Sequence, residues 1–471
     1  MRQRFVLPAV VAALTWACPV NPAQSAPVRA RDGAALPEID HLVIGKRIPL
    51  HVVRRPGAPG IVLQAMLRLG SSQDPPDRHG LVSTWAALLK RGAGPWSGPD
   101  IDEATDAVGA DLDVQTDDDR TSIRFSGLAE HLQLGVGLVT AMLTKPTFSE
   151  DEFTRERDRR LAAMRGTLDD ANAVTELAAA WLHFGDHPYA HSGSGTRRGL
   201  TAMTTENVRK FHERHVHPSS VEFVVVGDVD GKALTSTFAK ALGPWLEGSG
   251  TPVRPALPAY RPRVGRQVLF VPMPVTQAYI RMDLPSVARK HPDHLPLAVM
   301  AYILGGSSRG RLYQDIRDRQ GLAYGAYASQ QPLGTEGRLV LELQTKTSSA
   351  VRAIESMLAQ MRRMAEKGPT GAELDAAKDY LTGSWGARFE AGTDVAAQVA
   401  TVRFHGLGDD WFAEYPRRVR SLSTSTLQGV AARYLRTRRY GLTVVAPPGP
   451  LEQDLARFGT LQRLEPSVLL D

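Results

Sequence analysis

The chain has 471 residues, 42% of them hydrophobic and 23% charged, which is typical of a folded protein long enough for two or more domains. The net charge of +6 is small for this length and is spread along the sequence, without a run of Lys and Arg alternating with aromatic residues. We therefore expect no nucleic-acid partner.

The first 25 residues are expected to be a signal peptide. A basic start precedes an apolar run from Phe5 to Ala17, and small residues lead to an expected cleavage site after Ser25. The run is shorter than the roughly 20 residues that span a bilayer. It is also continuous, whereas the transit peptides of organelles are amphipathic. The segment therefore predicts export to the periplasm.

Cys18 is the only cysteine and lies inside this segment. A lipid anchor on Cys18 is an alternative that the preceding Thr15-Trp16-Ala17 disfavours. Without the segment the chain has no Cys, which is consistent with an exported protein that uses neither disulfides nor thiol chemistry.

Residues 80–92, GLVSTWAALLKRG, predict a helix that ends at Gly92. Leu81, Trp85 and Leu88 are spaced along one side of this helix. None of its side chains carries a carboxylate, imidazole or thiol, the groups that hold a metal ion in proteins.

Two patterns recur along the chain. Ser149 begins a Ser-x-x-Glu helix start, and Thr370 begins a Thr-x-x-Glu start 221 positions later. Residues 204–230 predict a helix followed by an apolar strand, and residues 423–449 repeat that order at an offset of about 219. Two nearly equal offsets indicate an internal duplication.

Residues 248–266 divide the two halves and contain four Pro and three Gly, which is typical of an extended linker. Each half mixes alternating, strand-like segments, such as 121–126 and 338–344, with helical ones. We expect an α+β fold of two homologous α/β sandwich domains, each a sheet covered by helices, most simply on one face.

The densest motif is LGGSSRGRLYQDIRDRQGLAYGAYAS, residues 304–329. A Gly-rich turn precedes a short amphipathic helix with Leu312 and Ile316, which ends at Gln320-Gly321 before a strand. This motif resembles the C-terminal signature of the pitrilysin/insulinase family of inverted zinc peptidases. FGDHPYAHSGSGT (184–196), VVVGDVD (224–230), the duplication and the linker resemble the same family, so the resemblance covers nearly all of the chain after the signal segment.

The resemblance implies an N-terminal domain over residues 26–247, the linker 248–266 and a C-terminal domain over 267–471. It further implies that Arg317 and Tyr324 bind substrate near the scissile bond, beside the Gly305-Gly306 loop. An Arg and a Tyr hydroxyl can donate hydrogen bonds to a peptide carbonyl or to the oxyanion that forms from it.

The family's metal motif is His-x-x-Glu-His, with a second Glu roughly 75 residues later. Matching Gly80-Leu81 and Gly92 to the family's pattern places Ser83, Ala86 and Ala87 at the three motif positions. Ala163, 76 residues beyond Ala87, occupies the distal ligand position. One hydroxyl and three methyl groups do not bind zinc, so we expect no metal in this chain.

Other candidate sites are disfavoured. The cluster HERHVH (212–217) superficially resembles a metal site, but only His212 and His215 could share a helix face, and Pro218 ends the helix. His187 and His79 are also expected to be structural. Gly306-Ser307-Ser308-Arg309-Gly310 has the Gly-x-Ser-x-Gly form of a serine nucleophile, which must follow a strand. The preceding residues 295–304 instead have helical spacing.

The resemblance therefore predicts a non-catalytic, substrate-binding subunit of a heterodimeric zinc peptidase. Zinc is expected in a partner subunit of the same family, and Arg317 and Tyr324 are expected to serve the partner's site on peptide substrates. Three alternatives remain open: a zinc peptidase with a relocated site, a scaffold protein without a hydrolytic role, and a homodimeric peptide-binding module.

Overall fold

The computed structural model describes residues 38–248, 257–263 and 265–471. The predicted signal segment with Cys18, and residues 249–256 and 264 of the predicted linker, lie outside the described residues. Within the described part of the chain, no helix has both the length and the apolar character needed to cross a membrane.

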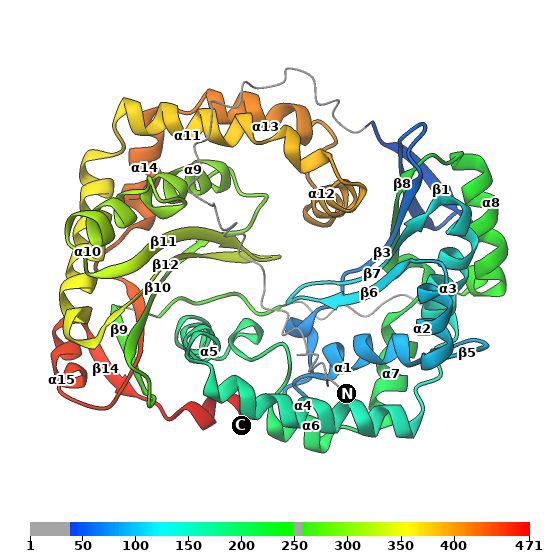
Figure 1. The fold of residues 1–471 in the computed structure, drawn as a ribbon, viewed down its shortest axis with the longest axis horizontal. Helices are drawn as coiled ribbons and strands as arrows, with labels where there is room; N and C mark the ends of the chain where they lie inside the picture. Colours follow the sequence, from blue (N-terminus) through cyan, green and yellow to red (C-terminus); the bar gives the residue numbers. More distant parts are fainter. Residues whose placement is uncertain (1–37, 249–256, 264) are drawn as a thin grey trace, which may run out of the picture.

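The strands form two large sheets with the same internal order (Figure 1). The first sheet has the order β1-β2-β8-β3-β7-β6 and the second the order β14-β9-β13-β10-β12-β11. Their strands are β1 Asp40–Ile44, β2 Ile48–Arg54, β3 Gly60–Leu67, β6 Asp111–Thr116, β7 Thr121–Leu128, β8 Val221–Gly227, β9 Arg266–Pro272, β10 Gln277–Val287, β11 Ala323–Pro332, β12 Glu336–Lys346, β13 Tyr440–Ala446 and β14 Thr460–Arg463. β4 (Gly92–Ala93) and β5 (Trp96–Ser97) form a separate short pair.

The pairing confirms the internal duplication. β2 runs parallel to β8 as β9 runs parallel to β13, whereas β3 and β10 are antiparallel to both of their neighbours. The halves differ at one edge, where β1 is antiparallel to β2 but β14 is parallel to β9.

Helices occur in the same order in each half. The first half contains α1 Leu81–Leu88, α2 Gly98–Asp106, α3 Leu132–Thr144, α4 Glu150–Asp169, α5 Ala171–Phe184, α6 Arg197–Ala202, α7 Thr205–His215 and α8 Gly231–Leu242. The second contains α9 His294–Gly305, a π-helix at Tyr313–Arg319, α10 Ala350–Lys367, α11 Gly371–Gly383, α12 Gly392–His405, α13 Trp411–Arg420, α14 Thr424–Tyr434 and α15 Leu451–Leu455.

The two predicted helix starts are confirmed. The Ser149 hydroxyl accepts a hydrogen bond from the Glu152 amide, and Thr370 forms a reciprocal capping box with Glu373. These contacts satisfy amide groups that the first helical turn leaves without partners. They fix the starts of α4 and α11, which are equivalent helices of the two halves.

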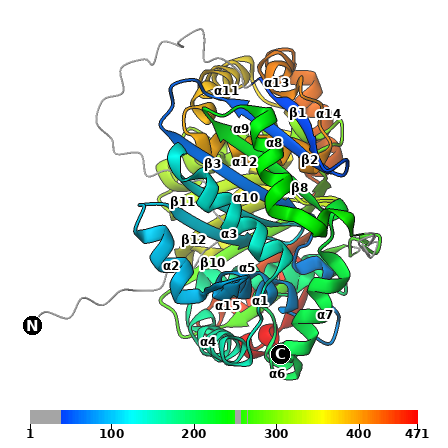
Figure 2. The same cartoon turned by 90° about the vertical axis from the view of Figure 1, so that its right-hand side faces the viewer.

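Helices cover both faces of each sheet, which differs from the expectation of one covered face. On the outer face of the first sheet, α3 and α8 lie over the strands (Figure 2). On its other face, α12 of the second half packs against β3 and β8 (Figure 1). In β8, Phe223 and Val225 face the first core while Val224 and Val226 face α12.

The arrangement is reciprocal, because α5 of the first half packs on β9, β10 and β13 of the second sheet. In β9, Val268 and Phe270 belong to the core of the second half, whereas Leu269 and Val271 pack with α5. Central strands buried on both faces read as continuous apolar runs, which explains the sequences of β8 and β9. Each half therefore completes the other half's core.

Candidate functional site

The helix α1, which carries Ser83, Ala86 and Ala87, is anchored at its start by Asp74. The buried carboxylate of Asp74 accepts hydrogen bonds from the amides of Gly80 (2.6 Å) and Val82 (2.8 Å). Burial raises the pKa of Asp74 to about 7, although these amide groups lower it. The helix predicted at residues 80–92 is thus present and rigidly placed.

Arg160 of α4 occupies the position beside Ser83. Its guanidinium donates from Nη1 to Ser83 Oγ (3.0 Å) and from Nη2 to the Ser83 carbonyl (2.8 Å). Nε donates to Glu156 Oε1 (2.7 Å), and Arg159 binds the same carboxylate. A fixed cation therefore lies where the family's resemblance places the first metal ligand.

The residues at the three expected ligand positions and the expected base position do not fit a zinc site. Ala86 is buried, Ser83 and Ala87 are half-buried on α1, and Ala163 is exposed on α4. Across residues 38–248, 257–263 and 265–471, no group of three or more His, Cys, Asp or Glu side chains could hold a metal ion. A hydroxyl already bound to a guanidinium and three methyl groups provide no ligand set.

The histidines singled out in the sequence have structural partners. His212 is buried, and its Nδ1 accepts a hydrogen bond from Trp85 Nε1 (3.1 Å), so Nε2 is the donor to the Leu143 carbonyl (3.1 Å). His187 Nδ1 accepts from the Tyr189 amide at 3.2 Å. His79 stacks on the ring of His191, with 3.8 Å between centroids.

In the second half, the signature motif forms a π-helix, Tyr313–Arg319, in place of the expected α-helix. The Gln320 amide donates to the Asp315 carbonyl, five residues back. Short π-helical stretches are rare and frequently occur at functional sites. The motif thus has an unusual backbone at the point where the family resemblance places substrate contacts.

The Gly305-Gly306 loop lies tightly against β11. A Cβ atom at Gly305 would lie 2.5 Å from the backbone N of Ala328, so only glycine allows this approach. The Gly306-x-Ser-x-Gly310 sequence follows the helix α9 and not a strand, which contradicts a nucleophile elbow. Next to it, Arg311 forms a two-pronged pair with Glu373, with both N–O distances 2.7 Å. This pair fixes the loop to α11.

The structure brings Arg317 and Tyr324 together. The Arg317 guanidinium carbon lies 4.7 Å from the centre of the Tyr313 ring and 4.9 Å from that of Tyr324. Cation–π contacts on both sides hold the guanidinium in place. Tyr324 is 83% exposed, so its hydroxyl remains accessible. Ser83, Ala86, Ala87 and Ala163 belong to the first half, whereas this pair belongs to the second (Figure 1).

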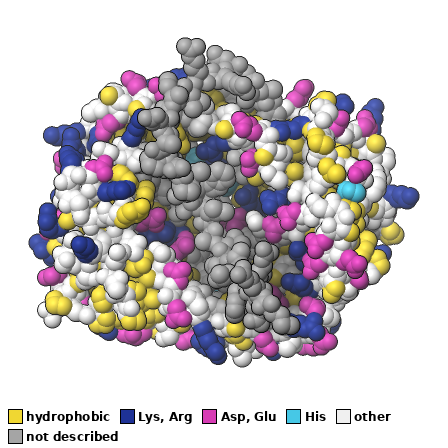
Figure 3. Space-filling model, in the orientation of Figure 1, with side chains coloured by type: hydrophobic (Ala, Val, Ile, Leu, Met, Phe, Trp, Pro, Cys, Tyr) yellow, Lys and Arg dark blue, Asp and Glu magenta, His cyan; other side chains and the backbone are white. Residues whose placement is uncertain are grey.

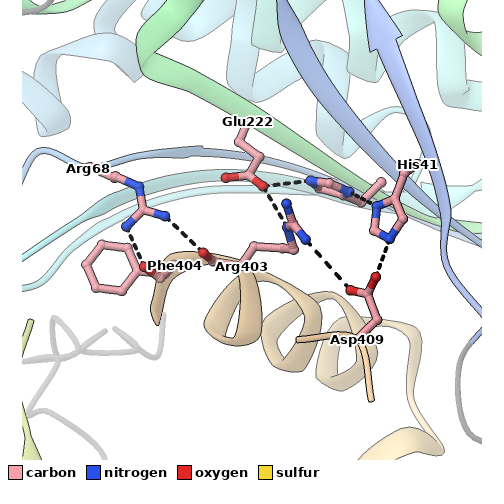
Figure 4. Close-up of polar contacts among 7 residues, drawn as sticks. His41, Arg68, Glu222, Arg403, Phe404 and Asp409 are labelled. Atoms are coloured by element: carbon pink, nitrogen blue, oxygen red, sulfur yellow. Dashed lines mark hydrogen bonds and ion pairs between the residues drawn. The ribbon is translucent and has the colours of Figure 1, made fainter. Parts of the chain in front are cut away.

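A polar network joins α12 to the first sheet (Figure 4). Glu222 Oε1 accepts from His51 Nε2 (2.6 Å) and from Arg403 Nε (3.1 Å). The Nδ1 atoms of His51 and His41 lie 2.7 Å apart, and His41 Nε2 lies 2.7 Å from a carboxylate oxygen of Asp409. Arg403 also lies 3.7 Å from Asp409, so its guanidinium contacts both carboxylates of the network.

Comparison with known proteins finds family models that match most of the chain. A sequence model described as Insulinase (Peptidase family M16) matches residues 61–181, and a model described as Peptidase M16 inactive domain matches residues 202–381. The chain belongs to the M16 peptidase family. The predicted family membership, two-domain fold and duplication are therefore confirmed.

Individual M16 relatives differ in what their names state. An uncharacterized zinc protease of Streptomyces coelicolor is 26% identical over 323 residues, covering 67% of this chain and 70% of the relative. The non-peptidase homolog YmxG of Helicobacter pylori is 22% identical, covering 67% of this chain and 73% of the relative. A structure from Pseudomonas fluorescens, described as a peptidase M16 inactive domain, has a TM-score of 0.81 at 20% identity. It covers 91% of this chain and 100% of that one.

Three contacts of this M16 chain were not predicted from the sequence. Arg160 is separated from Ser83 by 77 positions, so only the packing of α1 on α4 reveals their contact. The Arg311–Glu373 pair also depends on tertiary packing. Tyr313 could have been found, because it precedes Arg317 by four residues and such pairs meet on one side of a helix.

Proposed function

We propose that this chain is the non-catalytic, substrate-binding subunit of a zinc peptidase whose metal site lies in a second M16 chain. The substrate is a peptide, and the expected signal segment places the pair in the periplasm. One observation carries the proposal: Arg317 and the exposed Tyr324 are held in position, while Arg160 occupies the place of a metal ligand beside Ser83.

The two chains divide the chemistry. The partner supplies the zinc ion, which polarises the scissile carbonyl and activates water, together with the base. This chain supplies hydrogen-bond donors, the Arg317 guanidinium and the Tyr324 hydroxyl, to the carbonyl or its oxyanion. Because the rings of Tyr313 and Tyr324 already hold Arg317, little reorganisation is needed when the oxyanion forms.

A second candidate is an M16 scaffold or peptide-binding protein without a hydrolytic role. It is favoured by the absence of suitable side chains at the three ligand positions and the base position, and by the name of the non-peptidase homolog from Helicobacter pylori. The same residues are then retained for peptide binding or for assembly.

The decisive experiment uses the pair of this chain with an M16 chain that has an intact His-x-x-Glu-His motif. We expect co-purification and peptide hydrolysis. Arg317→Ala and Tyr324→Phe should each lower kcat, by roughly 10²–10³-fold if each removes one oxyanion donor. Arg319→Ala is the matched control, since Arg319 lies in the same π-helix but is exposed and pairs with Asp315 at 3.0 Å.

Unchanged turnover in both substituted pairs would contradict the assigned roles. Peptide binding without hydrolysis in any pair would favour the second candidate. Stoichiometric zinc in the chain purified alone would contradict both and indicate a relocated metal site.

A further inference from the structure

A group of basic side chains from both halves surrounds the C-terminal end of α12. Arg68 follows β3 and Arg120 precedes β7 in the first half, while Arg289 and Lys290 follow β10 in the second. His405 is the last residue of α12. We call these five residues the α12 basic cluster.

The ring of Phe404 organises the cluster. The guanidinium carbons of Arg68 and Arg120 lie 4.8 and 5.5 Å from its centre, and the His405 ring lies edge-on at 4.9 Å. The Nζ of Lys290 lies 3.9 Å from where a Cβ at Gly406 would be. Arg68, Arg120 and Lys290 thus bring positive charges together from three places in the sequence, and the His405 ring lies beside them.

Among the three arginines of the α12 basic cluster, Arg289 has the fewest interactions, within the described part of the chain, that offset its positive charge. It is half-buried, its Nε is buried without a hydrogen-bond partner among the described residues, and no ion pair is formed within that part of the chain. Burial, together with the charges of Arg120 and Arg388, lowers its pKa to about 10. A guanidinium in such a place is unfavourable until an anion binds it.

Two nearby histidines, His294 and His405, also lie close to these positive charges. His294, the first residue of α9, is 7% exposed, and its Nδ1 has no partner among the described residues. Burial and the Arg289 charge lower its pKa to about 3, and burial with Arg289, Arg120 and Arg68 does the same for His405. Arg120 forms an ion pair with Asp117, with 3.0 Å between its Nε and the carboxylate.

Hydrogen bonds to the carbonyls at the C-terminal end of α12 explain the position of Arg68 but not of every residue in the α12 basic cluster. Arg68 already donates to the carbonyls of Phe404 and, at 2.9 Å, of Arg403, as Figure 4 shows. These bonds satisfy the end of the helix, where cations are favoured. Arg289 and Lys290 make no hydrogen bond to these carbonyls, so their positive charges are available to a further anionic group.

We propose that the α12 basic cluster binds a carboxylate of the peptide substrate, with Arg289 as its central donor. The carboxylate is that of an Asp or Glu side chain or of the peptide C-terminus, because a guanidinium binds either one in a two-pronged manner. This inference rests on the proposed function and adds to it a preference for acidic peptides. Both halves contribute to the site, so it exists only in the assembled fold.

The test measures the binding of four labelled peptides to the full chain. The peptides share one sequence and differ in carrying Glu or Gln at one position and a free or amidated C-terminus. We expect at least one of the two carboxylates, that of the Glu side chain or that of the C-terminus, to tighten binding by about tenfold or more. The comparison in which binding tightens shows which carboxylate the cluster binds. Arg289→Gln should abolish the difference, whereas Lys210→Gln, which removes an exposed charge on α7, should retain it.

A second readout separates binding from folding. Because the buried Nε of Arg289 has no hydrogen-bond partner among the described residues, Arg289→Gln should leave the thermal midpoint unchanged or raise it, and the acidic peptide should stabilise the wild type more than this variant. A lowered midpoint, or equal binding of all four peptides to the wild type, would overturn the inference while leaving the proposed function intact. Binding of inorganic phosphate without discrimination among the peptides would also overturn it. Binding of no peptide, alone or in the pair, would overturn both.

Discussion

The contact of Arg160 with Ser83 gives a second reason to expect no zinc in this chain, besides the absence of metal ligands. Replacing ligands by Ser and Ala removes affinity for zinc, but a guanidinium bonded to Ser83 also places a permanent positive charge there. At an effective dielectric constant of 20, two unit charges about 4 Å apart repel by ~4 kcal/mol, and a divalent ion doubles this energy. At the positions that the resemblance assigns to the metal site, this chain therefore has no metal ligands, and it has a guanidinium, paired with Glu156, that opposes a metal ion.

Restoring His, Glu, His and Glu at positions 83, 86, 87 and 163, which the resemblance assigns to three ligands and the base, should not restore zinc binding while Arg160 is present. Adding Arg160→Leu should raise the zinc content of the dialysed protein towards one ion per chain, measured by elemental analysis. Arg159→Leu is the matched control, since Arg159 binds the same Glu156 carboxylate but lies on the exposed side of α4. Stoichiometric zinc in the variant that keeps Arg160 would show that its charge does not oppose the metal.

For single residues, the sequence predicts which chemical groups are present better than it predicts which residues are in contact. The absence of donor atoms at Ser83, Ala86, Ala87 and Ala163 is visible in the residue types alone. The contact of Arg160 with Ser83 is not, because it depends on how two helices pack. The family resemblance names Arg317 and Tyr324 as substrate-binding residues, but their contact with each other and with Tyr313 was not predicted, although Tyr313 lies only four residues before Arg317.

Individual elements were predicted well where local hydrogen bonds determine them. The capping residues Ser149 and Thr370 mark the starts of α4 and α11. The helix within the signature motif was expected to be α-helical, whereas it is a π-helix. Leu312 and Ile316 have a spacing that suits either form, so the sequence pattern alone could not distinguish them.

The start of α11 should make a measurable contribution to acid stability. Burial alone would raise the pKa of Glu373, but the Arg311 guanidinium and the Thr370 amide lower it to about 2. A carboxyl group whose pKa is lower in the folded state stabilises the protein above its unfolded pKa, and this stabilisation is lost as the pH falls. The window for Glu373 runs from about pH 4.5 down to about 2.

We expect Glu373→Gln to lower the free energy of unfolding at pH 7 and to reduce its decline between about pH 4.5 and 2. Urea unfolding at a series of pH values would measure both effects. Glu366→Gln, at an exposed position at the end of α10, should leave the pH profile unchanged. Parallel profiles for the wild type and Glu373→Gln would mean that the Arg311 pair does not stabilise the loop.

Each half contributes one helix to the sheet of the other half, and these contacts hold the two halves of the molecule together. The offsets of 221 and 219 predicted the duplication, and the strand orders confirm it. The exchange of α5 and α12 was not predicted, because an apolar helix face does not identify the sheet that it covers. The apolar strand β8 was predicted within residues 204–230, but its burial on both faces was not, because the helix that covers its second face lies in the other half. Figure 3 shows basic and acidic side chains intermixed on one face of the assembled molecule, consistent with its small net charge.

This exchange predicts that a substitution in one half will loosen the sheet of the other. Leu182 of α5 is 2% exposed and packs with Leu269, Val271 and Val445 of the second sheet. Leu182→Ala should cost about 2–5 kcal/mol, as for other buried leucines. Amide hydrogen exchange should become faster in β9 and β13, since local openings follow the contacts that are lost.

Leu138→Ala in α3 is the matched control, because Leu138 is fully buried in the first half's own core. It should accelerate exchange in β3 and β7 before β9 and β13. If Leu182→Ala instead accelerated exchange only within the first sheet, the two halves would be energetically independent despite their shared helices. If the exchange in β9 and β13 rises as expected, the packing of α5 couples the stability of the second sheet to the first half.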